Sequence, residues 1–143
     1  MDREADGRFF REAWIQGVKR YFPGTPKESY IAPWEAMREW EQQSAIAVYQ
    51  QVRAFICAGV HDGQLTPLTR EQGGRLIRIA WVGQMYKHVP DPKPAYIAPW
   101  EDMSSQWEQE VDCDIYEAIA ATALQEVTHV SVEAGQKSQE TSR

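Results

Sequence analysis

Four long segments of the chain carry hydrophobic residues at helical spacing. Residues 3–21 and 70–88 share one pattern, with apolar or aromatic side chains at i, i+4, i+8 and i+11. These stripes are Phe10, Trp14, Val18 and Tyr21 in the first segment and Ile77, Trp81, Met85 and His88 in the second. Side chains at this spacing share one face of an α-helix, so each segment predicts a helix with one buried face.

Two further helices are predicted, over residues 38–57 and from about residue 105 to about residue 128. Their apolar stripes are Ala45, Val48, Tyr49, Val52, Phe55 and Ile56 in the first and Trp107, Val111, Ile115 and Ile119 in the second. No segment shows the sustained two-residue alternation that indicates a β-strand. The sequence therefore predicts an all-α fold.

One hexapeptide, Tyr-Ile-Ala-Pro-Trp-Glu, occurs twice, at residues 30–35 and 96–101. The proline of each copy, Pro33 or Pro99, suits the first turn of a helix because its missing N–H needs no partner there. We therefore expect a short helix at residues 33–37 and another beginning at the second proline, in addition to the four long helices.

The hexapeptides mark a tandem duplication that covers most of the chain. Repeat 1 spans roughly residues 3–60 and repeat 2 roughly residues 70–127, and an Asp-Gly turn signal at 62–63 lies in the linker between them. Each repeat alone is a helix pair with too small a core, so the two should stack about a pseudo-twofold axis as one domain over residues 1–130. The polar segment 131–143 lacks periodicity and is predicted to be a disordered tail.

Composition limits the classes of function. The 143-residue chain is 43% hydrophobic with a formal net charge of −6, which argues against a general nucleic-acid binder because phosphate contacts need a basic surface. No apolar run is long enough to predict a membrane span, and the acidic N-terminus lacks a signal-peptide pattern. The two cysteines are too few for a disulfide scaffold, and Cys57 is predicted to lie in the core. We expect a cytoplasmic protein without nucleic-acid or membrane partners.

The region around the first hexapeptide resembles a pattern in short proteins of bacteriophages and actinobacteria. Those proteins carry Pro-Trp-Glu-x-Leu/Met, a spacer, and then an aromatic residue with an alanine-rich helix. The matching positions here are Pro33-Trp34-Glu35, Glu39-Trp40-Glu41 and Ser44-Ala45-Ile46-Ala47. The layout is also distantly similar to ryanodine-receptor-type (RyR) repeats, which occur in tandem pairs. That resemblance implies a structural or ligand-sensing module rather than an enzyme, and in bacteria a sensor of nucleotide-derived signals.

Two duplicated sets of side chains are candidates for a ligand site. The first helix of each repeat carries two arginines at i and i+3, and each hexapeptide supplies a tryptophan; the candidate ligand-binding residues are Arg8, Arg11, Trp34, Arg75, Arg78 and Trp100. Guanidinium groups beside indole rings suit an anionic, aromatic ligand such as a nucleotide. The alternative is structural: the tryptophans fill a duplicated core, and carboxylates of residues 101–127 neutralise the arginines of the second repeat.

No catalytic or metal-binding constellation stands out in the sequence. Glu110, Asp114 and Glu117 form an acidic stripe on the last helix, which we interpret as a solvated face rather than a metal site. The Glu-x-x-His pattern at 126–129 lacks the second such motif and the two further glutamates that a di-iron site needs. Cys113 lies between two aspartates whose charges oppose thiolate formation.

The sequence favours a small non-enzymatic interaction module that binds a protein partner or itself, without a cofactor or a metal. The alternative is a sensor or sponge that captures an anionic nucleotide-like molecule at the interface between the repeats. An open pocket lined by arginine and tryptophan would favour the sensor. A filled core with an exposed apolar patch would favour the interaction module.

Overall fold

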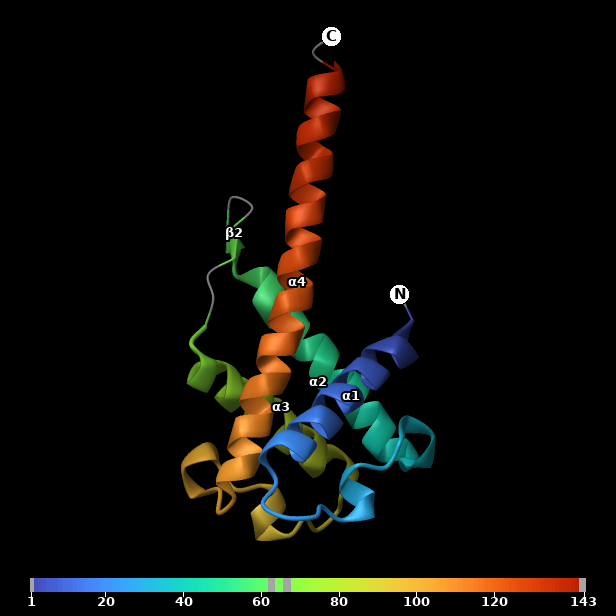
Figure 1. Ribbon diagram of the computed structural model, residues 1–143, viewed down its shortest axis with the longest axis vertical. Helices are drawn as coiled ribbons and strands as arrows, with labels where there is room; N and C mark the ends of the chain where they lie inside the picture. Colours follow the sequence, from blue (N-terminus) through green and yellow to red (C-terminus); the bar gives the residue numbers. More distant parts are fainter. Residues whose placement is uncertain (1, 62–63, 66–67, 142–143) are drawn as a thin grey trace.

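The computed structural model describes the backbone of residues 2–61, 64–65 and 68–141, and the surroundings of side chains in 2–59 and 68–126. Over the described backbone the chain forms four α-helices, four short 3-10 helices and one pair of two-residue strands (Figure 1). In chain order these are α1 (Arg3–Tyr21), η1 (Glu28–Tyr30), η2 (Trp34–Ala36), α2 (Glu39–Ala58), β1 (Val60–His61), β2 (Gln64–Leu65), α3 (Arg70–His88), η3 (Pro94–Tyr96), η4 (Trp100–Asp102) and α4 (Gln106–Thr141). The all-α prediction is confirmed.

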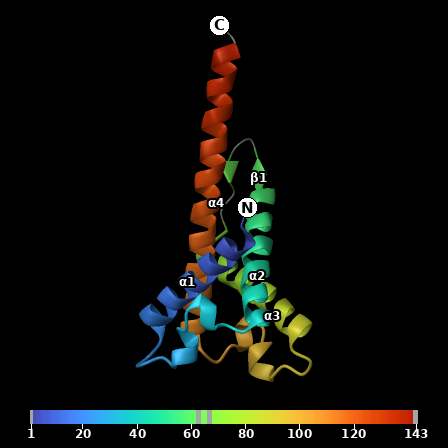
Figure 2. The same ribbon diagram turned by 90° about the vertical axis from the view of Figure 1, so that its right-hand side faces the viewer.

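The four α-helices form two pairs that pack against each other. α1 contacts both α2 and α4, and α3 contacts both α4 and α2. The first helix of each repeat therefore packs against the second helix of its own repeat and against that of the other repeat. The loops that carry the 3-10 helices gather towards one end of the bundle (Figures 1 and 2). These reciprocal contacts agree with stacked repeats, and a pseudo-twofold relation between them stays a prediction.

The core lies where the four predicted stripes meet. Its most deeply buried side chains are Val18, Val48, Val52, Ile77, Val111, Ile115 and Ile119. Phe55, a member of the predicted stripe of α2, faces away from it, because its side chain is 54% exposed. The paired tryptophans Trp14, Trp81, Trp40 and Trp107 lie half-buried around the core rather than inside it.

Local chain signals fix where α1 and α3 begin. Asp2 caps α1 by accepting a hydrogen bond from the backbone N–H of Glu4 at 3.0 Å. Thr69 and Gln72 form a capping box at the start of α3, as the sequence predicts. Both caps pair backbone donors that an α-helix leaves unpaired at its first turn. The first helix of each repeat therefore starts at a fixed residue.

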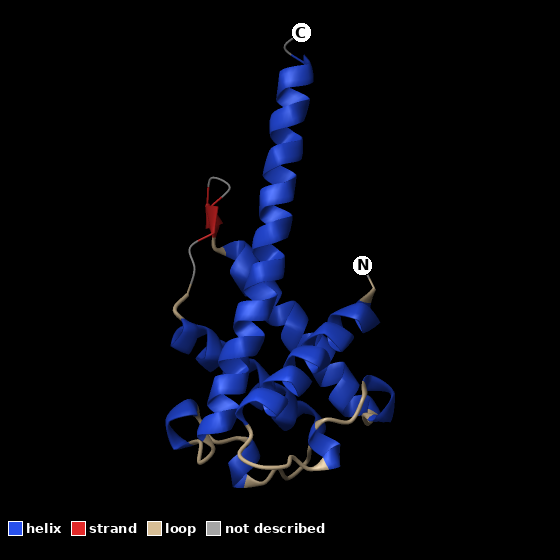
Figure 3. Cartoon of the chain, in the orientation of Figure 1, coloured by secondary structure: helices blue, strands red, loops and turns tan. Residues whose placement is uncertain are grey.

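The connections contain elements that the helical pattern did not predict. β1 and β2 form a small antiparallel hairpin between the repeats, with Val60 paired to Leu65 (Figure 3). The predicted turn at 62–63 lies outside the described residues. η1 and η3 lie in the two loops that lead into the hexapeptides. The short helices predicted at the hexapeptide prolines are single 3-10 turns, η2 and η4.

α4 is longer than its apolar stripe. The helix continues to Thr141, whereas the sequence predicts an end near residue 128 and a disordered tail over 131–143. In both views the last part of α4 stands clear of the bundle (Figures 1 and 2). Extending a helix that has already formed fixes only one residue at a time, so helix-favouring residues such as Glu133, Ala134 and Gln136 can prolong it beyond the apolar stripe.

Candidate functional site

Two of the candidate arginines hold the hexapeptide loops in place. Arg11 and Arg78 are buried, and each donates two hydrogen bonds to backbone carbonyls of the loop in its own repeat. The bonds run from Nε to the carbonyl oxygen of Ala32 at 3.0 Å or Ala98 at 2.9 Å, and from Nη2 to that of Ser29 or Ala95 at 3.1 Å. Burial lowers the pKa of the Arg11 guanidinium, and the nearby carboxylate of Glu41 opposes that shift. These donors are therefore used within the chain.

The hexapeptide tryptophans close over a glycine in the preceding helix. A Cβ atom at Gly7 would lie 2.3 Å from the indole of Trp34, and one at Gly74 would lie 2.8 Å from that of Trp100. Each glycine thus allows a close approach of the ring. Trp34 is only 7% exposed, so its ring packs in the protein.

The outer pair of arginines binds the glutamates of the same hexapeptides. Nη1 of Arg8 lies 2.7 Å from Oε1 of Glu35, and Arg75 forms the equivalent ion pair with Glu101. Each guanidinium also lies over the ring of its hexapeptide tryptophan, at 5.9 Å in repeat 1 and 5.8 Å in repeat 2. Hydrogen bonding to Glu35 raises the pKa of Arg8, and the bond to Glu101 raises that of Arg75.

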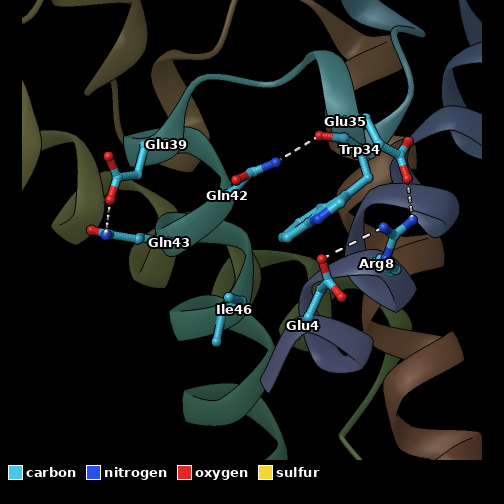
Figure 4. Close-up of a pocket in the computed structure, with 8 residues that line it drawn as sticks. All are labelled: Glu4, Arg8, Trp34, Glu35, Glu39, Gln42, Gln43 and Ile46. Atoms are coloured by element: carbon cyan, nitrogen blue, oxygen red, sulfur yellow. Dashed lines mark hydrogen bonds and ion pairs between the residues drawn. The ribbon is translucent and has the colours of Figure 1, made fainter. Parts of the chain in front are cut away.

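A shallow surface depression of about 430 Å³ lies beside the loop of repeat 1 (Figure 4). Its lining residues are Glu4, Arg8, Trp34, Glu35, Glu39, Gln42, Gln43 and Ile46. Of the six candidate ligand residues, only Arg8 and Trp34 reach it. The three glutamates outnumber the single arginine, so the depression has the wrong charge for the anionic ligand that the sequence suggests.

The acidic stripe of α4 forms ion pairs with an arginine of α3. Arg70, at the start of α3, lies 2.8 Å from carboxylate oxygens of both Glu110 and Asp114 and 2.5 Å from one of Glu117. These contacts, with the hydrogen bond to Glu110 the strongest, raise the pKa of Arg70. The solvated face predicted for this stripe is thus an ion-pair network between α3 and α4. Within the described residues no group of three or more His, Cys, Asp or Glu side chains could hold a metal ion.

The two cysteines differ in their surroundings. Burial raises the pKa of the Cys113 thiol to about 11 despite the opposing charge of Arg70, so the thiol stays protonated and unreactive near neutral pH. Cys57 is exposed, which corrects its predicted place in the core. It lies in the last turn of α2.

One buried carboxylic acid belongs to the second repeat alone. Asp112 is 8% exposed, and burial raises its pKa well above the ordinary value, with Arg78 opposing and Glu108 adding to the shift. The equivalent residue of the first repeat is Ala45, which is fully buried. The depression beside the loop of repeat 1 is not lined by this acid.

A further departure from the repeat lies on the outside of α3. Ile79 is 70% exposed and Tyr86 is 62% exposed, and none of the described atoms outside the helix comes within 4 Å of a Cβ built at Gly83. We define the α3 outer face as Gln72, Arg75, Ile79, Gly83 and Tyr86, which fall at i, i+3, i+7, i+11 and i+14. Helical spacing places these five residues along one face.

The corresponding face of α1 is polar. The residues equivalent to Ile79, Gly83 and Tyr86 are Glu12, Gln16 and Lys19, all exposed. Nε2 of Gln16 donates a hydrogen bond to Glu12 across one helical turn, at 2.9 Å. A comparison that looks only for residues common to both repeats misses this difference. Aligning the repeats and looking for apolar residues that replace charged ones would have found it.

No family model, curated protein or solved structure matches the chain. The resemblance to phage proteins and RyR repeats therefore stays a prediction. Among the described helices, none is both long and apolar enough to cross a membrane.

Proposed function

We propose that this protein is a small non-enzymatic interaction module that binds a protein partner, or a second copy of itself, through the α3 outer face. The observation that carries the proposal is the replacement of Glu12 and Lys19 on α1 by exposed Ile79 and Tyr86 on α3. A stripe that is polar on one copy of a repeated unit, and apolar and exposed on the other, points to an external partner.

The energetics of exposure support this assignment. Leaving an isoleucine and a tyrosine in water forgoes roughly 1.5–3 kcal/mol for each large side chain that could otherwise be buried. Exposed tyrosine is also common in the centre of protein interfaces, where the ring packs and the hydroxyl keeps a polar partner. The α3 outer face thus has the composition of a binding surface of modest size.

The sensor hypothesis loses support from the same geometry. Arg11 and Arg78 donate to loop carbonyls, and Arg8 and Arg75 bind hexapeptide glutamates. A nucleotide-like anion would have to break these contacts before it could use any of the four guanidinium groups. A cytoplasmic location belongs to the proposal and is supported by the free thiol of exposed Cys57.

Photo-cross-linking in cells tests the proposed function. A photoreactive amino acid replaces Ile79 in one variant and Glu12, at the equivalent position of α1, in the matched control. We expect protein adducts from position 79, whether with another protein or with a second copy, and few from position 12. Equal yields from both positions, or none from either, would show that the α3 outer face is not a binding surface.

A further inference from the structure

Two polar atoms on the inner side of α3 are buried and find no hydrogen-bond partner among the described residues. They are Oε1 of Gln84 and Nε2 of His88. Gln84 is only 6% exposed, and His88 is half-buried. The two residues are four positions apart, so their side chains lie one helical turn apart on the same face. In the unfolded chain both atoms bond to water, and folding must replace those bonds or lose stability.

This face of α3 packs against the start of α2. The ring centroids of His88 and Trp40 lie 6.4 Å apart. α2 runs away from the end of the bundle that carries the loops and α3 runs back to it, so the two helices are antiparallel (Figures 1 and 2). One turn along each helix from this contact are Gln84 on α3 and Ser44 on α2. Ser44 is fully buried, and its hydroxyl donates a hydrogen bond to the carbonyl oxygen of Trp40 at 2.8 Å.

The equivalent contact in the other half of the molecule is apolar. Alignment of the repeats pairs Gln84 with Gly17 and Ser44 with Val111. A Cβ built at Gly17 would lie 2.8 Å from Cγ1 of Val111, so this place on α1 faces that place on α4. The reciprocal contacts of the helices therefore indicate that Gln84 lies against Ser44. An amide and a hydroxyl thus replace a glycine and a valine in the contact between the repeats.

His88 also lacks the partner that its counterpart has. The counterpart is Tyr21, whose hydroxyl donates a hydrogen bond to Oδ1 of Asp114 on α4 at 3.1 Å. The residue of α2 equivalent to Asp114 is Ala47, which has no side-chain acceptor. The Nε2 atom of His88 therefore needs a partner that this position of α2 does not supply.

We propose that an internal water molecule lies between α2 and α3 and links Gln84, His88 and Ser44. The water donates its two hydrogens to Oε1 of Gln84 and Oγ of Ser44, and its oxygen accepts the Nε2–H of His88. A buried water typically makes about three hydrogen bonds, which these three groups provide. Polar atoms that share a buried face without bonding to each other are commonly joined in this way. The inference concerns the inner side of α3 and is independent of the proposed function.

Magnetic relaxation dispersion of water oxygen-17 tests the site, because it counts the long-lived internal waters of the purified full chain. Gln84→Met keeps the length of the side chain but removes the acceptor, and we expect this variant to hold one internal water fewer than the wild type. The matched control is Gln16→Met, which changes an exposed glutamine of α1 and should leave the count unchanged. An equal count in the wild type and Gln84→Met would overturn the proposal.

Thermal unfolding of a double-mutant cycle provides a second test. Gln84→Met alone and His88→Phe alone each leave the water short of a partner, and each should lower the melting temperature by about 2–4 °C. The double variant removes both polar atoms, and its melting temperature should fall by less than the sum of the two single changes.

Two atoms that are simply unpaired would behave in the opposite way. Each single substitution would then remove an unsatisfied polar group and raise the melting temperature, and the two effects would add. That result would overturn the proposed water. Circular dichroism checks that every variant keeps its helix content.

Discussion

Single residues show how the duplicated chemistry is used. The arginines and tryptophans repeat because each repeat needs the same loop held against the same helix: Arg11 and Arg78 bind carbonyl oxygens, and Trp34 and Trp100 cover glycines. The sequence identifies all of these residues but cannot separate a repeated structural role from a repeated ligand site. Both roles need a guanidinium group near an indole ring, and only the acceptor of the guanidinium hydrogen bonds distinguishes them.

Two glycines of α3 should respond in opposite ways to the same substitution. Gly74→Ala forces a methyl group to within 2.6 Å of the Cys113 sulfur, and we expect a net loss of about 1–2 kcal/mol in unfolding free energy. Gly83→Ala meets open space and improves helix propensity, so it should add up to about 1 kcal/mol. Urea unfolding in dilute solution measures both. Equal effects would contradict the tight loop packing in repeat 2.

The buried acid predicts a pH-dependent stability difference. The pKa of Asp112 is higher in the folded chain than in the unfolded chain, so folding favours its protonated form and the protein loses stability as pH rises through that folded value. Replacing Asp112 with alanine, the residue at the equivalent Ala45, should therefore stabilise the protein at pH 7 by about 1–3 kcal/mol.

This gain should shrink as the pH falls towards the pKa of an unfolded aspartate, because the wild-type acid is then neutral in both states. Thermal unfolding of both proteins from pH 4 to pH 7 measures the difference. A gain that stays constant across this range would show that Asp112 does not titrate as a buried acid.

Whole elements were predictable where apolar spacing defines them. The starts of α1 and α3 follow from Asp2 and the Thr69–Gln72 box, and the buried faces follow from residues such as Val18 and Ile77. Spacing carries no information about η1 and η3, because single turns lack a period. It also misplaces the end of α4, because a helix can continue on propensity alone after its buried face ends.

Shortening α4 tests which part of the helix contributes to folding. Ending the chain after Ser131 should leave the melting temperature within about 2 °C of the full chain, since the backbone beyond this point stands clear of the bundle in both views (Figures 1 and 2). Ending it after Ala118 removes Ile119 and Ala123, both fully buried, and should prevent cooperative unfolding. Differential scanning calorimetry compares the two. A large fall in the melting temperature of the chain that ends after Ser131 would show that the part of α4 beyond this residue packs against the protein.

The whole molecule combines duplicated loop contacts with an unequal exterior. In both repeats, equivalent side-chain hydrogen bonds hold the hexapeptide loop, and the helices of the two repeats contact one another reciprocally. The exteriors differ at Glu12 and Ile79, where one copy is charged and the other apolar. The proposed function depends on this difference at the α3 outer face.

A dilution series followed by NMR tests this account most directly, because it maps self-association residue by residue. Backbone amide signals are recorded from high to low protein concentration. We predict that the signals that shift belong to the α3 outer face, above all Ile79, Gly83 and Tyr86, while those of Glu12, Gln16 and Lys19 on α1 stay fixed. Shifts that cluster on α1 or beside Arg8 and Trp34 would contradict the account, as would unchanged spectra together with a failure of position 79 to form adducts in cells.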